Sequence, residues 1–122
     1  MGKVDDILKE IKEHVEDAVF TAIVNLDDGT PVAGQTFQED FDIEVPIAFF
    51  SDVARRSMKA SRETGFGNLE DAVLTTEEQF VIMRILPGGE YVHLLSIGRN
   101  GNWGIAKVAM QRYAQRLRDS LP

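Results

Sequence analysis

The spacing of hydrophobic residues changes several times along the chain, and each change predicts a new secondary-structure element. Near the N-terminus, apolar residues recur three and four positions apart, with Asp, Glu and Lys between them, which is the spacing of one helical face. They are Val4, Ile7, Leu8, Ile11 and Val15. This pattern predicts an amphipathic helix over residues 3–16.

The next apolar runs have the composition of strands. The sequence VFTAIVNL is rich in β-branched and apolar residues and ends just before Asp28-Gly29. An Asp-Gly pair between two such runs is a strong hairpin signal, because glycine accepts a positive φ. The return strand is TPVAGQT, with Pro31 at its start, where no ladder hydrogen bond is required. The acidic stretch FQEDFDIEVP follows and is typical of a turn region.

A second helix is predicted over residues 44–64. Pro46 is tolerated because it falls in the first turn, and Gly65 and Gly67 end the helix. Three strands follow, the last two joined by the turn sequence Pro-Gly-Gly. We expect them at residues 68–76, 79–86 and 90–97.

A final helix is predicted over residues 103–120. Apolar residues spaced three and four apart define its buried face. They are Trp103, Ala106, Met110, Tyr113, Leu117 and Leu121.

The element order is therefore α-β-β-α-β-β-β-α in one domain spanning residues 1–122. The hairpins imply a mainly antiparallel five-stranded sheet, which places the fold in the α/β (α+β) class. Strands such as FVIMRIL and YVHLLSI carry apolar residues at both parities, as expected when both faces of a sheet are covered. Three helices achieve that with two on one face and one on the other.

The middle helix carries more apolar residues than one buried stripe requires. Ile47, Phe50, Ala54 and Met58 form one line along it, and a second group extends this line sideways. The second group is Phe49, Val53 and Ala60. Two readings are open: a contact with the same helix of a symmetry mate, or simply a wide core face.

Charge is unevenly distributed in this acidic chain, whose net charge is −7. Residues 1–52 hold 13 acids and 3 bases, whereas residues 53–122 hold 7 acids and 10 bases. The acidic balance argues against general nucleic-acid binding. No apolar run approaches a membrane span or a signal peptide, so we expect a cytoplasmic protein without membrane insertion.

Four of the cations fall within the short sequence RRSMKASR. They are Arg55, Arg56, Lys59 and Arg62. Such a cluster in an acidic chain is a candidate docking surface for a partner with surface carboxylates. The alternative is a set of solvated side chains favoured by the helix dipole near a C-terminus.

Residues suited to catalysis or metal binding are few. The chain has no cysteine and two histidines, so we expect no metal site and no cofactor. His14 is expected in solvent, and His93, which alternates with Tyr91 and Leu95, is expected as a packed neutral side chain. Gly65-Phe66-Gly67 leads from helix to strand, the reverse of a phosphate-binding loop. We therefore expect a protein that is not an enzyme.

Three segments together resemble the roadblock (dynein light-chain roadblock) family in its bacterial single-domain, MglB-like form. They are the hairpin VNLDDGTPVAG, the run ETGFGNLEDAVLTTEEQFVIMRIL after the middle helix, and the closing pattern YVHLLSIGRNGNWGIAKVAMQRYAQRL. The resemblance covers residues 5–121. It implies a profilin-like sandwich with the element order given above.

The resemblance also implies a homodimer and a partner. Roadblock members pair their third strands across a two-fold axis and pack their middle helices side by side. In this sequence, the seam then includes Phe49, Val53, Ala60, Asp71, Val73 and Thr75. MglB-like members bind a Ras-like small GTPase and accelerate its GTP hydrolysis. A pure scaffold without effect on GTP turnover, and a small-molecule sensory domain, remain alternatives.

Overall fold

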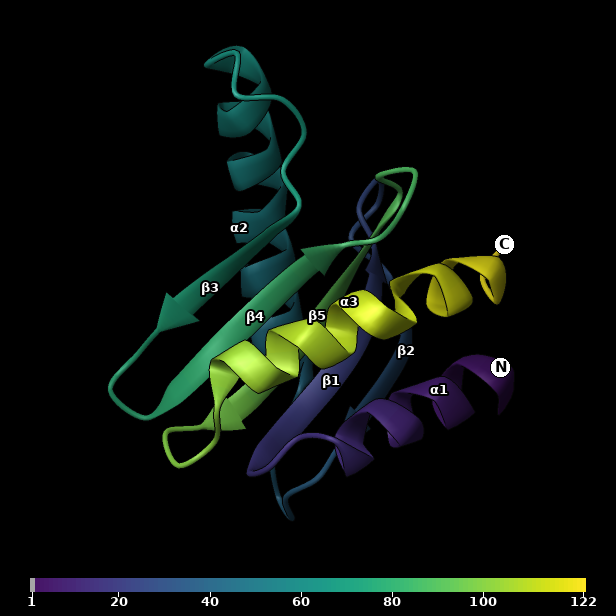
Figure 1. Ribbon diagram of the computed structural model, residues 1–122, viewed down its shortest axis with the longest axis vertical. Coiled ribbons are helices and arrows are strands. Elements are labelled where there is room, and N and C mark those ends of the chain that lie inside the picture. Colours follow the sequence, from purple (N-terminus) through teal and green to yellow (C-terminus); the bar gives the residue numbers. More distant parts are fainter. Residues whose placement is uncertain (1) are drawn as a thin grey trace.

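The computed structural model describes residues 2–122 and shows a five-stranded sheet between two helical layers (Figure 1). The elements occur in the order predicted from the sequence. They are α1 (Gly2–Glu13), β1 (Ala18–Asn25), β2 (Pro31–Thr36), α2 (Glu44–Glu63), β3 (Asp71–Thr75), β4 (Gln79–Ile85), β5 (Tyr91–Gly98) and α3 (Trp103–Asp119).

All neighbouring strands of the sheet run antiparallel, in the order β2-β1-β5-β4-β3. The central strand β5 is buried from Tyr91 to Ile97, because both of its faces are covered. β2 and β3 form the two edges. The edge strand β3 therefore pairs with β4 on one side only, and its other side presents unpaired backbone groups.

Two helices cover one face of the sheet and one covers the other, as predicted. α1 and α3 lie side by side and share a core cluster that includes Ile7, Leu8 and Leu117. α2 packs on the opposite face over β1 and β5, where Ile47 and Ala54 join a second cluster. Figure 1 shows α3 and α1 in front of the sheet and α2 behind it.

Two element boundaries differ from the sequence prediction by three residues, and the others differ by one at most. α1 ends at Glu13 rather than at residue 16, because the amides of His14 and Val15 bond to carbonyls three residues back, and the positive φ of Asp17 turns the chain into β1. β3 begins at Asp71, so residues 68–70 form a connecting segment instead of strand.

The prediction that Trp103 belongs to the buried face of the last helix is wrong, since its side chain is 43% exposed. Trp103 is the first residue of α3 and directly follows the cap Asn102, whose side chain accepts a hydrogen bond from the amide of Ile105. The helix makes its first fully buried contact one turn later, at Ala106.

α2 is longer than the sheet face beneath it. Its buried residues all lie within its first eleven positions: Ile47, Ser51 and Ala54. Figure 1 shows the C-terminal half extending beyond the end of the sheet, with the chain returning from it to β3. This projecting half-helix therefore carries most of the cations singled out in the sequence.

Candidate protein-interaction surface

The first turn of α2 fixes how the helix is seated on the sheet. The Asp42 carboxylate accepts a hydrogen bond from the amide of Glu44 at 2.9 Å, which satisfies one of the free donors at the helix start. The hydroxyl of buried Ser51 donates a hydrogen bond to the carbonyl oxygen of Ala48 at 3.1 Å. The buried stripe of α2 packs on β1 and β5, and the rest of the helix surface is half-buried or exposed.

One of these faces continues into the sheet edge as an apolar strip. Phe49 is 69% exposed, and half-buried Phe50 and Val53 lie beside it on α2. Half-buried Ala72 and Leu74 of β3 belong to the same cluster as Phe50 and Val53. The strip thus runs from α2 to the face of β3, the strand at this edge of the sheet.

The seam residues predicted on β3 lie on the face of the strand opposite the one beside α2. Val73 packs against the cluster beneath α3, and Asp71 pairs with Lys107 of α3. Thr75 shares their parity and is exposed. Beside α2, the side chains that β3 presents are therefore Ala72 and Leu74. Alternation alone could not reveal this, because both parities of DAVLT include apolar residues.

Asp71 is also occupied within its own chain. Its carboxylate lies 3.0 Å from Arg84 and 3.2 Å from Lys107, and its side chain is 13% exposed. Ala60, the third apolar residue proposed for the helix seam, is exposed on the projecting half of α2. Phe49, Val53 and Ala60 all lie on one side of the helix, as their spacing predicts.

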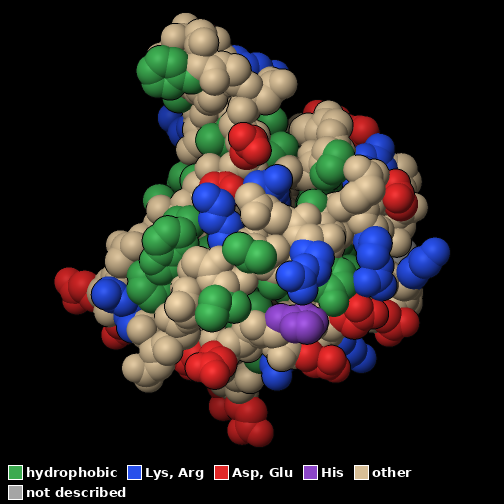
Figure 2. All heavy atoms as spheres, viewed as in Figure 1, with side chains coloured by type: hydrophobic (Ala, Val, Ile, Leu, Met, Phe, Trp, Pro, Cys, Tyr) green, Lys and Arg blue, Asp and Glu red, His purple; other side chains and the backbone are tan. Residues whose placement is uncertain are grey.

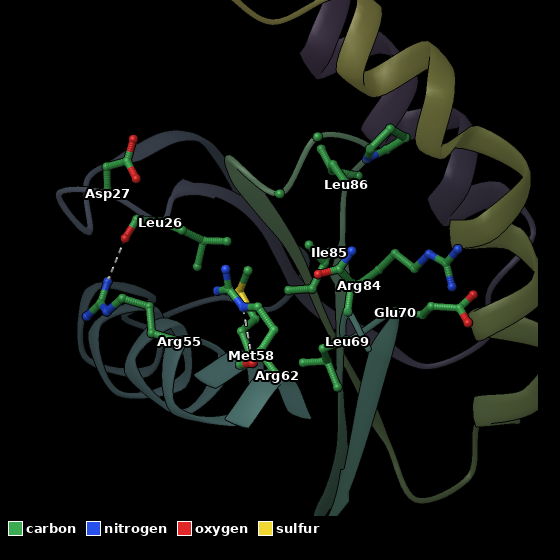
Figure 3. A pocket seen from close by; sticks show the side chains of 14 residues that line it. Leu26, Asp27, Arg55, Met58, Arg62, Leu69, Glu70, Arg84, Ile85 and Leu86 are labelled. Atoms are coloured by element: carbon green, nitrogen blue, oxygen red, sulfur yellow. Dashed lines mark hydrogen bonds between the residues drawn. The ribbon is translucent and has the colours of Figure 1, made fainter. Parts of the chain in front are cut away.

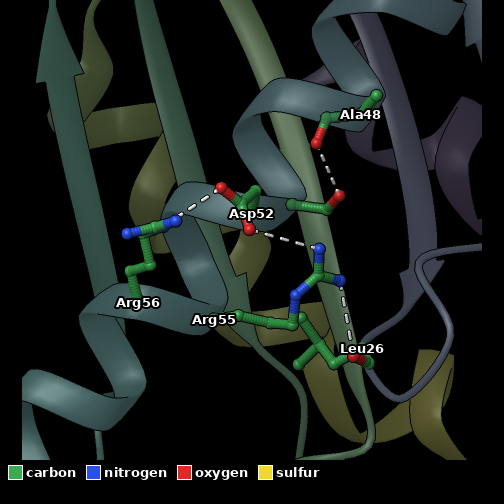
Figure 4. A network of polar contacts seen from close by, with 6 residues as sticks. Leu26, Ala48, Asp52, Arg55 and Arg56 are labelled. Atoms are coloured by element: carbon green, nitrogen blue, oxygen red, sulfur yellow. Dashed lines mark hydrogen bonds and ion pairs between the residues drawn. The ribbon is translucent and has the colours of Figure 1, made fainter.

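The first two cations of the cluster are linked through one carboxylate. Arg56 donates to Asp52 from Nε at 3.2 Å, and Arg55 donates to the same carboxylate at 3.5 Å (Figure 4). The Arg55 guanidinium also reaches the carbonyl oxygen of Leu26 at 3.5 Å, in the turn after β1. The two guanidiniums therefore diverge, and only Arg55 leans toward the body of the protein.

The other two cations are more loosely held. Lys59 lies 4.0 Å from Glu63 in a pair whose side chains are both mostly exposed. Arg62 donates to the backbone carbonyl of Met58 at 3.5 Å and forms no ion pair within residues 2–122. Exposed pairs of this kind contribute roughly 0–1 kcal/mol, so a partner carboxylate can displace them at little cost.

A cleft of about 700 Å³ separates the projecting half of α2 from the rest of the protein (Figure 3). Arg55, Met58 and Arg62 line it from α2, with Leu69 and Ile85 on the facing wall. The structure therefore divides the predicted patch into two parts. Arg55 and Arg62 line the cleft, whereas Arg56 and Lys59 are not among its lining residues.

Neither histidine forms part of this surface. His93 is fully buried, and burial lowers its pKa to about 3, so it is neutral as expected. His14 is exposed, and its ring lies 3.3 Å from the hydroxyl of Tyr113. Within residues 2–122, no three His, Asp or Glu side chains are grouped as metal ligands would be. No helix in the same range is both long and apolar enough to span a membrane.

Similarity to known proteins lies in the fold. The structure superimposes on Myxococcus xanthus MglB with a TM-score of 0.82 and 11% identity, covering 98% of this chain and 97% of that one. A Roadblock/LC7 domain from Streptomyces avermitilis gives a TM-score of 0.81 at 14% identity, with 95% of each chain covered. MglC from Myxococcus xanthus gives 0.68 at 19% identity, covering 98% of this chain and 99% of that one.

The chain therefore has the roadblock-type fold in its MglB-like form, as the sequence resemblance implied. No protein-family model matches the chain, and no curated protein matches it. At these identities the likeness concerns the arrangement of the helices and strands.

Proposed function

We propose that this protein is a cytoplasmic, non-catalytic homodimer that binds a Ras-like small GTPase through α2 and regulates its GTP hydrolysis. The proposal rests on how little of α2 is buried within its own chain. α2 is a 20-residue helix with three buried residues, an exposed apolar flank and a basic half that projects from the protein. A helix with so little packing in its own chain is expected to be completed by other chains.

The homodimer accounts for the apolar flank. Antiparallel pairing of two β3 edges satisfies the free backbone groups of both strands and joins the sheets of two protomers. The same two-fold axis brings the two α2 helices side by side, so that Phe49 and Val53 of each chain become buried. Ala72 and Leu74 lie between the strand and the helix and extend the buried area.

The cations account for the choice of partner. Arg56, Lys59 and the cleft residues Arg55 and Arg62 form a basic surface on an otherwise acidic protein, which favours a partner with carboxylates on its contact surface. The roadblock-type fold supports a Ras-like GTPase as that partner, through the resemblance of the sequence to MglB-like members. In an activator, the dimer positions groups of the GTPase itself, and no arginine of this chain is assigned as an inserted finger.

The test is nucleotide-dependent binding followed by a turnover assay. The purified protein is immobilised and exposed to lysate of its own cells with a non-hydrolysable GTP analogue or with GDP. The expected result is a Ras-like GTPase retained with the analogue, identified by mass spectrometry. Single-turnover GTP hydrolysis, measured with and without this protein, then separates an activator from a scaffold that binds without changing the rate.

Charge reversal defines the surface involved. We expect Arg55→Glu together with Arg62→Glu to weaken binding of the retained GTPase, with Lys3→Glu together with Lys9→Glu on α1 as a control of equal charge change. If no GTPase is retained with either nucleotide, the proposal is contradicted and the sensory-domain alternative is favoured. A co-purified small molecule in the cleft, detected by native mass spectrometry, supports that alternative.

A further inference from the structure

The first turns of α3 carry an apolar patch that the proposed function does not use. Half of the large hydrophobic side chains exposed in residues 2–122 lie within six positions of one another on this helix. They are Trp103, Ile105 and Val108, which are 43%, 57% and 53% exposed. Figure 2 shows hydrophobic side chains gathered over this part of α3, with Lys and Arg side chains beside them. The patch lies on the sheet face opposite α2.

The geometry of the patch suits a helix. Ile105, Val108 and Arg112 are spaced three and four residues apart and therefore form one ridge along α3. A shallow groove runs beside this ridge, between the start of α3 and His14 at the end of α1. A ridge next to a groove is the surface on which a second helix packs, with its own apolar residues spaced three and four apart.

The electrostatics of the patch favour an acidic occupant. The groove is lined by His14 and Arg112 but by no Asp or Glu, although the chain carries 20 acids. Lys107 is committed to Asp71, whereas Arg112 forms no ion pair within residues 2–122. The first turn of α3 also has no acidic residue to offset the positive end of the helix dipole.

We infer that Ile105, Val108 and Arg112 form a second docking site, which binds an amphipathic helix of a partner protein with carboxylates flanking its apolar stripe. The inference does not depend on the function proposed for α2. Because the two surfaces lie on opposite faces of the sheet, one protomer can hold a partner on each at the same time. The protein would then link its α2 partner to a second protein.

Trp103 provides one readout, because it is the single tryptophan of the chain and directly precedes Gly104, which lines the groove. The probes are two synthetic, tryptophan-free amphipathic peptides of roughly 18 residues, about five helical turns. Both have the same leucine stripe, flanked by Glu in one peptide and by Lys in the other. Binding is measured by isothermal titration calorimetry and by the change in Trp103 emission during titration.

We expect the Glu-flanked peptide to bind about tenfold or more tightly than the Lys-flanked one at low salt, and this ratio to shrink as salt is added. Arg112→Glu should abolish or reverse the preference, and Val108→Asp should abolish binding of both peptides. Lys3→Glu makes the same charge change at the far end of α1 and should leave binding unchanged. Since these side chains are exposed, all variants are expected to keep the thermal unfolding midpoint of the native protein.

Three results would overturn the inference. The first is the absence of measurable binding of either peptide in the calorimetric titration. The second is equal affinity of native protein and Arg112→Glu for the acidic peptide. The third is a fall in solution mass on Val108→Asp with no peptide binding to the native protein, which would show that a second copy of the chain occupies the patch.

Discussion

The Nε2 atom of His93 lies 2.9 Å from the hydroxyl oxygen of Thr21, and both side chains are buried in the protein interior. The Thr21 hydroxyl donates its proton to the carbonyl of Leu94 at 3.0 Å. It therefore accepts from His93, which fixes the proton of the neutral imidazole on Nε2. The Nδ1 atom has no partner among the described residues, so the interior offers nothing to stabilise a second proton.

This arrangement predicts a loss of stability in mild acid. Burial lowers the pKa of His93 from 6.5 to about 3 in the folded state, so between these values the unfolded chain binds a proton that the folded chain does not. The stability linked to neutral His93 is fully present above pH 6.5. It is lost as pH falls toward 3, and the free energy of unfolding then decreases by at most about 1.4 kcal/mol per pH unit. Urea unfolding of native protein and of His93→Leu between pH 7.5 and 4.5 measures it.

The variant lacks the titrating group, so the difference between the two unfolding free energies should change with pH in favour of His93→Leu as acid is added. Two parallel curves across this range would show that His93 is not held neutral in the folded state. Carboxylate titration affects both proteins equally and cancels in the difference.

A second prediction concerns the edge strand β3. Asp71→Asn removes the carboxylate that pairs with Arg84 and Lys107 and leaves the mostly buried Arg84 guanidinium without its counter-charge. Nε of Arg84 is already buried without a partner among the described residues, so the cost should be about 2 kcal/mol of unfolding free energy. Chemical denaturation measures it. Lys107→Met removes a more exposed partner and should cost less, and the reverse order would contradict this assignment.

A third prediction concerns Asp52, which competes with any acidic partner for Arg55 and Arg56. Asp52→Asn should raise the affinity for the GTPase retained on α2 by about threefold at low salt, while stability changes by less than about 0.5 kcal/mol. The matched control is Asp119→Asn, the same charge change on α3. Equal affinities of native protein and Asp52→Asn would remove Arg55 and Arg56 from the contact.

Most of the fold could be predicted from the sequence because its signals are local. Three-four spacing located α1, and Asp28-Gly29 located the first hairpin, where Gly29 has a φ of +74°. The error at Trp103 has a simple cause, since helical periodicity continues into the first turn of α3, before the helix reaches the sheet. Where a helix meets the sheet is a tertiary property that spacing does not contain.

The candidate site was predictable in part. The cation cluster and the surplus apolar side of α2 follow from residue spacing alone. The division of the cations between the cleft and the open surface does not follow from spacing, because Arg55 points toward Leu26, which is 29 positions away in the sequence. The choice of Ala72 and Leu74 over Asp71 and Val73 depends on which face of β3 lies beside α2. The exposed residues Ile105 and Val108 were not singled out, since an apolar residue off the main stripe carries no signal of exposure.

The central claim is that two copies pair through the apolar strip from α2 to β3, and solution mass tests it most directly. Sedimentation equilibrium at micromolar concentration should give twice the chain mass of 13.6 kDa for native protein and the single mass for Phe49→Asp. Ile105→Asp, an equally polar change at a similarly exposed residue of α3, should leave the dimer intact. A native mass of 13.6 kDa, or a dimer unaffected by Phe49→Asp, would contradict the account.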